Sequence, residues 1–253
     1  MFKNIVTFII IFFIIYDINL EILPFITTAR VGFMYLVLTN INHLKLLVKE
    51  YKYFKEIMLL LLFVSLFQSL FSDDYIQFSR IFFFIVYSLI CSFLITLRVR
   101  NLMKLLWIFL IAISFQSLIL LYGFFNPDFK TLLDTYIIFG ANYSSDNLYR
   151  AFGLTSSGGA ALSIIQAFGA AIGLFILYCD SKNWKWLNIA LIILCASSTF
   201  FTGRTGILIF IIFLLAYLFV TFNFRNLFKY LAITIIIMSL SLRFIDLMES
   251  KLD

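Results

Sequence analysis

Long apolar runs alternate with short polar segments along this chain. The apolar runs occupy residues 4–20, 23–41, 56–71, 81–97, 105–124, 160–179, 187–202, 205–223 and 230–245. A helix of roughly 20 residues crosses the ~30 Å hydrocarbon core of a bilayer. Strands of a membrane barrel would alternate apolar and polar residues, whereas these runs are apolar on every face. The pattern predicts an all-α, polytopic integral membrane protein with about nine transmembrane helices.

The composition agrees with this pattern. Of the 253 residues, 63% are hydrophobic and 13% are charged, and the mean hydropathy is +1.06, which excludes a water-soluble globular domain. The first apolar run resembles a signal peptide, but no small-residue cleavage site follows it, so we expect a retained membrane helix. The chain is expected to form a single transmembrane domain, 1–253.

The distribution of basic residues predicts the orientation. Eleven of the nineteen lysines and arginines lie in four loops, at 42–55, 98–104, 180–186 and 224–229. The positive-inside rule places these loops in the cytoplasm. The N-terminus then lies inside, and the long loop at about 125–159 and the short turn near residue 203 lie outside. The net charge of +6 is explained by the inner-loop lysines, so no nucleic-acid partner is expected.

Lysine predominates in the inner loops, whereas arginine predominates on the outer side. The outer basic residues are Arg30, Arg80, Arg150, Arg204 and Arg243 against Lys130 and Lys251. A guanidinium offers a planar fork of donors that binds phosphate in a bidentate manner, so we expect an outward anion site. Arg30 is predicted to lie about 10 Å inside its helix. Its alternatives are an ion pair with Asp17 or Glu21, or extension of the side chain to lipid headgroups.

The segment 149–175, "YRAFGLTSSGGAALSIIQAFGAAIGLF", holds five of the ten glycines. Its first half is expected at the outer membrane surface, where Arg150 and the following hydroxyls would meet an anionic headgroup above a helix N-terminus. In its second half, Gly169 and Gly173 have the spacing that lets helices pack closely in lipid. Gln166 is expected to bond to a neighbouring helix rather than to a ligand.

Three short motifs, "RAFGLTSSGG", "SSTFFTGRTGILIFIIFLL" and "ITTARVGFMYLVL", are similar to those of the bacterial O-antigen polymerase and O-antigen ligase superfamily. The resemblance implies a metal-independent glycosyltransferase, without a cofactor, in the bacterial cytoplasmic membrane. Its substrate would be an undecaprenyl-diphosphate-linked glycan, which it would join to another glycan on the outer face of the membrane, as a polymerase of a surface polysaccharide or as a ligase. The implied partners are membrane lipids, a flippase and a chain-length regulator.

The expected site residues follow from the motifs and from the outward charges. The expected catalytic residues are Arg150 and Arg204, which the resemblance places at diphosphate-binding positions, and Asp146, an outward carboxylate four residues before Arg150. The candidates for the base are Asp146 and the other outward carboxylates, Asp73, Asp74, Asp128 and Asp134. The expected substrate-binding residues are Arg30, Arg80, Gly153, Ser156 and Ser157. No metal site is expected, since the single histidine, His43, falls in a cytoplasmic loop.

Two departures from the pattern leave other interpretations open. Members of the superfamily are usually longer, with a second large external loop, so the chain is expected to be truncated after residue 253. A polysaccharide flippase or small-molecule transporter is the main alternative, because intramembrane charges and broken helices also mark transport paths. A third is a membrane assembly subunit, in which the pair Gly169 and Gly173 would make the key contact.

Overall fold

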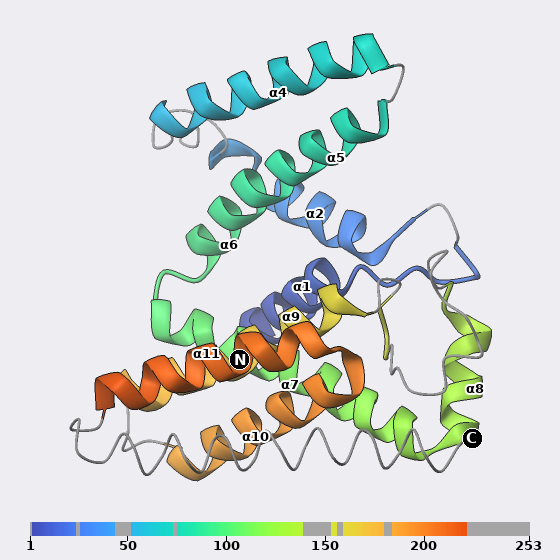
Figure 1. The fold of residues 1–253 in the computed structure, drawn as a ribbon. Coiled ribbons are helices and arrows are strands. Elements are labelled where there is room, and N and C mark those ends of the chain that lie inside the picture. Colours follow the sequence, from blue (N-terminus) through green and yellow to red (C-terminus); the bar gives the residue numbers. More distant parts are fainter. Residues whose placement is uncertain are drawn as a thin grey trace. The chain divides into compact units, whose positions relative to one another are not determined.

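The fold is all-helical in the part of the chain that the structure, a computed structural model, describes: residues 2–23, 26–43, 52–72, 75–138, 153–155, 159–179 and 184–221 (Figure 1). The chain divides into two compact units, Met1–Ile108 and Phe109–Asp253. The expectation that 1–253 forms one domain stays a prediction.

The first unit consists of paired helices. In chain order its elements are α1 (Phe2–Tyr16), α2 (Thr28–Thr39), the short 3-10 helix η1 (Ile41–His43), α4 (Lys52–Ser72), α5 (Tyr75–Ile85), the π-helix η2 (Val86–Cys91) and α6 (Ser92–Arg98). Helix α1 packs against α2, and α4 packs against α5. Gly32 lies against α1, where a Cβ atom would be 3.1 Å from Ile14, so the first pair packs closely.

Arg98 links three helix ends of the first unit. Its Nε donates a hydrogen bond of 2.8 Å to the hydroxyl of Thr7 near the start of α1. Its guanidinium also lies over the ring of Tyr35, near the end of α2, 5.5 Å from the ring centroid. The start of α1 and the ends of α2 and α6 therefore share one end of this unit, as the alternating directions predicted for these helices require.

The second unit is built around α9. Its helices are α7 (Leu102–Phe125), which begins just before the boundary between the units, α8 (Pro127–Tyr136), α9 (Ala160–Cys179), α10 (Lys185–Thr202) and α11 (Arg204–Thr221). Helix α9 packs against both α10 and α11 (Figure 1). Small residues allow this: a Cβ on Gly169 would be 2.4 Å from Ile113 of α7, and one on Gly173 would be 2.4 Å from Ile192 of α10. The predicted packing role of these glycines is confirmed.

Polar side chains join α7, α9 and α10 inside the second unit. The hydroxyl of Ser117 donates to Oε1 of Gln166, and the hydroxyl of Ser198 lies 3.3 Å from the same oxygen. Closer to the C-terminal end of α9, Nδ2 of Asn188 donates to the carbonyl of Gly173 at 2.9 Å. Interhelical hydrogen bonds of this kind hold helices together in lipid, so the role expected for Gln166 is confirmed.

Among the residues that the structure describes, five helical segments are long and apolar enough to cross a membrane, by length and composition: Ile81–Arg98, Leu102–Phe125, Ala160–Cys179, Lys185–Thr202 and Arg204–Thr221. Three further apolar helices are shorter: Asn4–Tyr16, Thr28–Thr39 and Glu56–Phe71. These eight coincide with the first eight apolar runs of the sequence. The ninth run, 230–245, lies outside the described residues.

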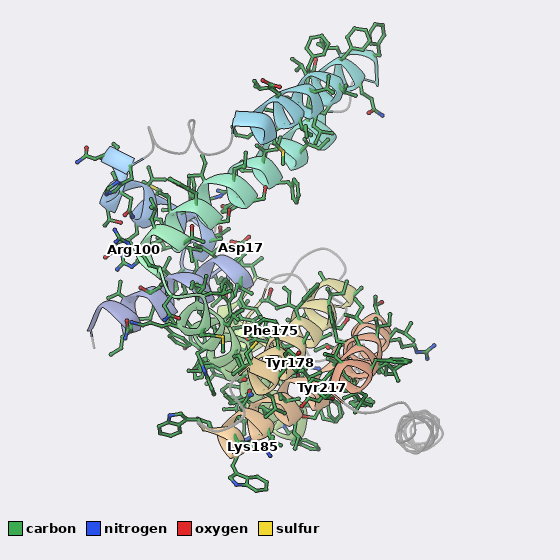
Figure 2. The ribbon with its side chains drawn as sticks, turned by 90° about the vertical axis from the view of Figure 1, so that its left-hand side faces the viewer. Asp17, Arg100, Phe175, Tyr178, Lys185 and Tyr217 are labelled. Carbon is green, nitrogen blue, oxygen red and sulfur yellow. The ribbon has the colours of Figure 1, made fainter. Side chains whose placement is uncertain are left out.

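One end of the second unit carries the aromatic residues typical of a membrane boundary. Trp184 and Trp186 are 73% and 81% exposed on either side of Lys185, and Tyr178 at the end of α9 is also exposed. Figure 2 shows Tyr178, Lys185 and Tyr217 near the ends of α9, α10 and α11 that lie on this side. Tryptophan and tyrosine concentrate at membrane–water interfaces. The opposite ends of these helices hold Ala160, Thr202 and Arg204.

Two segments expected as loops contain helix. The segment 72–80, which separates the apolar runs 56–71 and 81–97, is helical up to Ser72 and again from Tyr75, so Arg80 is the sixth residue of α5. Within 125–159, α8 folds back on α7, with the rings of Phe129 and Tyr122 4.8 Å apart. The start of α8 is explained by Asn126, whose side chain accepts a hydrogen bond from the amide of Phe129 ahead of a proline at the first helical position.

Candidate functional site

A short non-helical turn, residues 153–155, lies beside the interior of α7. Gly153 has φ of +58° and is buried, and Thr155 is buried as well. A Cβ on Gly153 would be 2.4 Å from Nε2 of Gln116 and 3.0 Å from Leu120. Gln116 precedes the end of α7 by nine residues, or about 14 Å of helix. We call residues 153–155 the re-entrant turn, because Gly153 lies alongside α7 and not beyond its end.

This position bears on an expectation. Gly153 was expected with its motif at the outer membrane surface, which stays a prediction, and the structure packs it beside α7, against Gln116 and Leu120. The physical reason is that glycine lacks a side chain and adopts a positive φ readily, so the backbone approaches α7 closely here. Non-helical backbone at membrane depth is tolerated only where protein buries it or where it lines a polar cavity.

The start of α9 and the start of α11 are held together. The hydroxyl of Ser163 accepts a hydrogen bond of 3.2 Å from the amide of Gly206, one of the amides in the first turn of α11 that have no partner within their own helix. A Cβ on Gly206 would lie 2.3 Å from the carbonyl oxygen of Ser163, so the two backbones touch. Gly203 lies close to the same helix start but leaves more room, because its Cβ would be 3.1 Å from the hydroxyl of Ser163 and 3.4 Å from the carbonyl oxygen of Gly159.

Arg204 is the first residue of α11 and is exposed. Gly203 alone separates it from the end of α10 at Thr202, which agrees with the short turn predicted near residue 203. A cation at the N-terminus of a helix opposes the helix dipole, so Arg204 does not stabilise α11 in this way. An anion placed there would be attracted both by the guanidinium and by the helix terminus.

The last residue of one sequence motif, Gly159, therefore lies beside a second motif at one end of the second unit. The start of α9, which follows "RAFGLTSSGG", contacts the turn that carries "TGRTG", and Phe124 of α7 packs on Phe201 of α10 with ring centroids 4.3 Å apart. Of the expected site residues, Arg204 and Gly153 lie in this unit. Four others lie outside the described residues: Arg150, Asp146, Ser156 and Ser157.

Arg30 belongs to the first unit and lies near a second polar cluster. The carboxylate of Asp17 accepts a hydrogen bond of 3.3 Å from the amide of Ala29, next to Arg30. Tyr87, on the π-helix, lies close enough to Asp17 and Arg30 to interact with the charges of both side chains. Phe33 of α2 packs on the same tyrosine with ring centroids 5.7 Å apart. π-Helical segments are frequent at functional sites, so this cluster is a separate candidate within its own unit.

The depth expected for Arg30 is wrong. Helix α2 begins at Thr28, so Arg30 lies in the first helical turn and is exposed, instead of lying about 10 Å inside the helix. The start is fixed by Thr28, whose hydroxyl accepts from the amide of Ile18 at 2.7 Å and ties α2 to the end of α1. Arg80 lies in the same unit, on α5.

Sequence reasoning missed two residues of these clusters. Gln116 is a single amide within the apolar run 105–124, and Tyr87 is one aromatic residue among many in 81–97. A polar side chain inside a membrane run is a usable signal, since such groups need partners in lipid. No comparable signal marks Tyr87.

The chain matches no known protein family, no curated protein and no solved structure. The geometry of these two clusters is therefore what bears on function.

Proposed function

We propose that this chain is a membrane glycosyltransferase that polymerises undecaprenyl-diphosphate-linked oligosaccharide units of a bacterial surface polysaccharide. It acts on the outer face of the cytoplasmic membrane and crosses that membrane about nine times, with 230–245 as the last span. One observation carries the proposal: the start of α9 and the arginine-bearing start of α11 are held together by the bond between Ser163 and Gly206. Arg150 precedes that first element by ten residues.

The proposed chemistry is a direct transfer. The oxygen of an acceptor hydroxyl attacks the anomeric carbon of the donor, and the bond from that carbon to the diphosphate oxygen breaks. The electron pair goes to the diphosphate, and Arg150 and Arg204 stabilise its growing negative charge in a site with little water. Asp146 accepts the proton of the acceptor hydroxyl. The carrier diphosphate leaves, and one glycosidic bond is formed.

A flippase or transporter is the alternative. A transport path would need polar groups that are available to the cargo along the bundle. The polar side chains of Ser117, Gln166 and Ser198 instead bond to one another. This pairing favours a packing role for these three side chains over a place along a transport path.

The test is the length distribution of surface polysaccharide in cells that lack the gene. The deletion strain is complemented with wild type, Arg150→Ala, Arg204→Ala or Arg100→Ala at matched membrane levels. Arg100 is an exposed arginine between α6 and α7 and serves as the control. We expect single repeat units in the deletion strain, and a ladder restored by wild type and Arg100→Ala but not by the other two variants.

An unchanged ladder in the deletion strain would contradict the proposal. A ladder restored by both Arg150→Ala and Arg204→Ala would contradict the assigned site while leaving the activity in place.

A further inference from the structure

Gln116 is a fully buried amide without a hydrogen-bond partner. Its side chain is 0% exposed, and among the described residues neither its Oε1 nor its Nε2 makes a hydrogen bond. Leaving such a group unpaired in the interior is unfavourable, and buried polar groups in folded proteins are nearly always bonded. An amide with both atoms unpaired is therefore not explained by the packing of this unit.

A second glutamine provides an internal comparison. Gln166, on the facing helix α9, is also 0% exposed, but its Oε1 accepts from Ser117 and Ser198. Ser117 is the immediate neighbour of Gln116, so both amides lie at nearly the same level of the bundle. One glutamine bonds the helices together, whereas the other points elsewhere.

The amide of Gln116 is directed at the re-entrant turn. Its Nε2 is the atom nearest to a Cβ placed on Gly153, at 2.4 Å. The turn is non-helical backbone that packs beside the interior of α7, a helix long and apolar enough to cross a membrane. Non-helical backbone and an unpaired amide beside such a helix are the features of a polar binding site in a membrane protein.

The level of Gln116 fits a ligand that is anchored near Arg204. Ser163, which bonds to the start of α11, and Gln166, at the level of Gln116, are separated by three residues of α9, or about 5 Å. A group attached directly to a diphosphate at Arg204 spans such a distance.

We propose that Gln116 binds a sugar of the lipid-linked oligosaccharide, and this inference rests on the proposed function. A carboxamide has both a donor and an acceptor, so it pairs fully with an acetamido group or with two neighbouring sugar hydroxyls. A phosphate only accepts hydrogen bonds and would leave Oε1 unpaired. Gly153 covers the amide in the described arrangement, so the re-entrant turn shifts when the sugar binds.

The experiment uses the purified full chain and compares wild type with Gln116→Met and the matched control Gln166→Met. Methionine keeps the length of the side chain and removes its hydrogen bonds. Without ligand, we expect Gln116→Met to unfold at or above the temperature of wild type and Gln166→Met to unfold below it. The two binding probes are undecaprenyl diphosphate and the lipid-linked oligosaccharide extracted from the deletion strain.

We expect wild type to bind the oligosaccharide probe more tightly than undecaprenyl diphosphate. Gln116→Met should weaken binding of the oligosaccharide probe about tenfold, through the loss of two hydrogen bonds, and should leave the affinity for undecaprenyl diphosphate unchanged. Gln166→Met should keep the preference of wild type.

Three results would overturn the inference. Equal binding of the oligosaccharide probe by wild type and Gln116→Met would reject the role of Gln116 but leave the proposed function standing. Unfolding of Gln116→Met well below wild type would show that the amide serves the fold. Failure of wild type to bind either probe would reject the proposed function, and the inference with it.

Discussion

Single residues decide how closely backbone segments approach in this protein. Gly153 brings the re-entrant turn against α7, and Gly206 brings the start of α11 against α9. Gly123, inside α7, differs from both, because a Cβ there would be 3.7 Å or more from its neighbours on α8. Substitution of each glycine by alanine therefore compares the effect of an added methyl group on stability at crowded and open positions of one unit.

At Gly153, alanine is expected to destabilise the second unit. A positive φ is unfavourable for a residue with a Cβ by about 1–2 kcal/mol, and the methyl group would also displace the amide of Gln116. Gly123→Ala is the control and should raise stability by about 0.5–1 kcal/mol, since alanine favours a helix. Thermal unfolding of the purified variants in detergent checks both, and equal effects at the two positions would contradict the described turn.

Arg98 gives the corresponding prediction for the first unit. Arg98→Ala removes the hydrogen bond to Thr7 and the contact with Tyr35, so we expect stability to fall by about 1–2 kcal/mol. Arg98→Lys keeps the charge but loses the planar guanidinium, and should recover only part of the lost stability. The neighbouring variant Arg100→Ala is the control and should unfold like wild type. Wild-type stability of Arg98→Lys in the same unfolding measurement would contradict the prediction.

At the scale of elements, the second unit depends on helices that touch at small residues. Gly206→Ala would place a methyl group 2.3 Å from the backbone oxygen of Ser163, which cannot rotate away as a side-chain atom would. The helices α9 and α11 must then separate, and overpacking of this kind destabilises by about 1–3 kcal/mol. Thr205→Ala, at an exposed neighbouring position, is the matched control.

The same variant also affects the proposed site. Separation of α11 from α9 moves Arg204 relative to the segment that follows Arg150, so Gly206→Ala should shorten the polysaccharide ladder. Thr205→Ala should leave the ladder as in wild type. A normal ladder from Gly206→Ala at wild-type membrane levels would mean that the contact between these helices is not needed for the proposed activity.

The helices themselves could be predicted because lipid imposes a simple rule on sequence. Runs such as 105–124 and 205–223 are apolar on every face and coincide with α7 and α11, since backbone groups in lipid must bond within their own helix. The packing of Gly169 and Gly173 and the bonding of Gln166 also followed from their residue types. Helix α8 was missed, although Asn126 and Pro127 form a recognisable helix start.

The candidate site was less predictable because its key features depend on contacts between distant segments. The position of Gly153 is set by its packing on Gln116 and Leu120, and no residue of "RAFGL" indicates that α7 is its neighbour. The pairing of Ser163 with Gly206 joins residues 43 positions apart. The first turn of α2 was misplaced because the apolar run extends beyond the helix, whose start is set by the hydroxyl of Thr28.

At the scale of the whole molecule, the proposed orientation places the Arg204 end of the second unit outside and the Trp184 end inside. Cys179 is exposed near the tryptophans, whereas Cys91 and Cys195 are buried. A membrane-impermeant thiol reagent applied to intact spheroplasts should therefore leave the wild-type chain unlabelled. It should label Thr205→Cys in a Cys179→Ser background, because Thr205 is exposed at the other end.

Permeabilised membranes provide the control for this experiment. Cys179 should then react with the reagent in the wild-type chain. Labelling of Cys179 in intact spheroplasts, without labelling of Thr205→Cys, would show that the predicted orientation is inverted, and the outward anion site would have to be given up.

The single residue between α10 and α11 also constrains how the protein is made. Because Gly203 is the whole connection between them, α10 and α11 cannot enter the bilayer independently of each other. In the proposed orientation, Arg204 at the tip must be carried across the membrane, and an arginine at the bilayer centre is disfavoured by about 2.5–3.5 kcal/mol during translocon insertion. The two apolar helices together offset this penalty, so they are expected to leave the ribosome and insert as one hairpin. Biogenesis of this region should accordingly stall when α11 is cut short during synthesis.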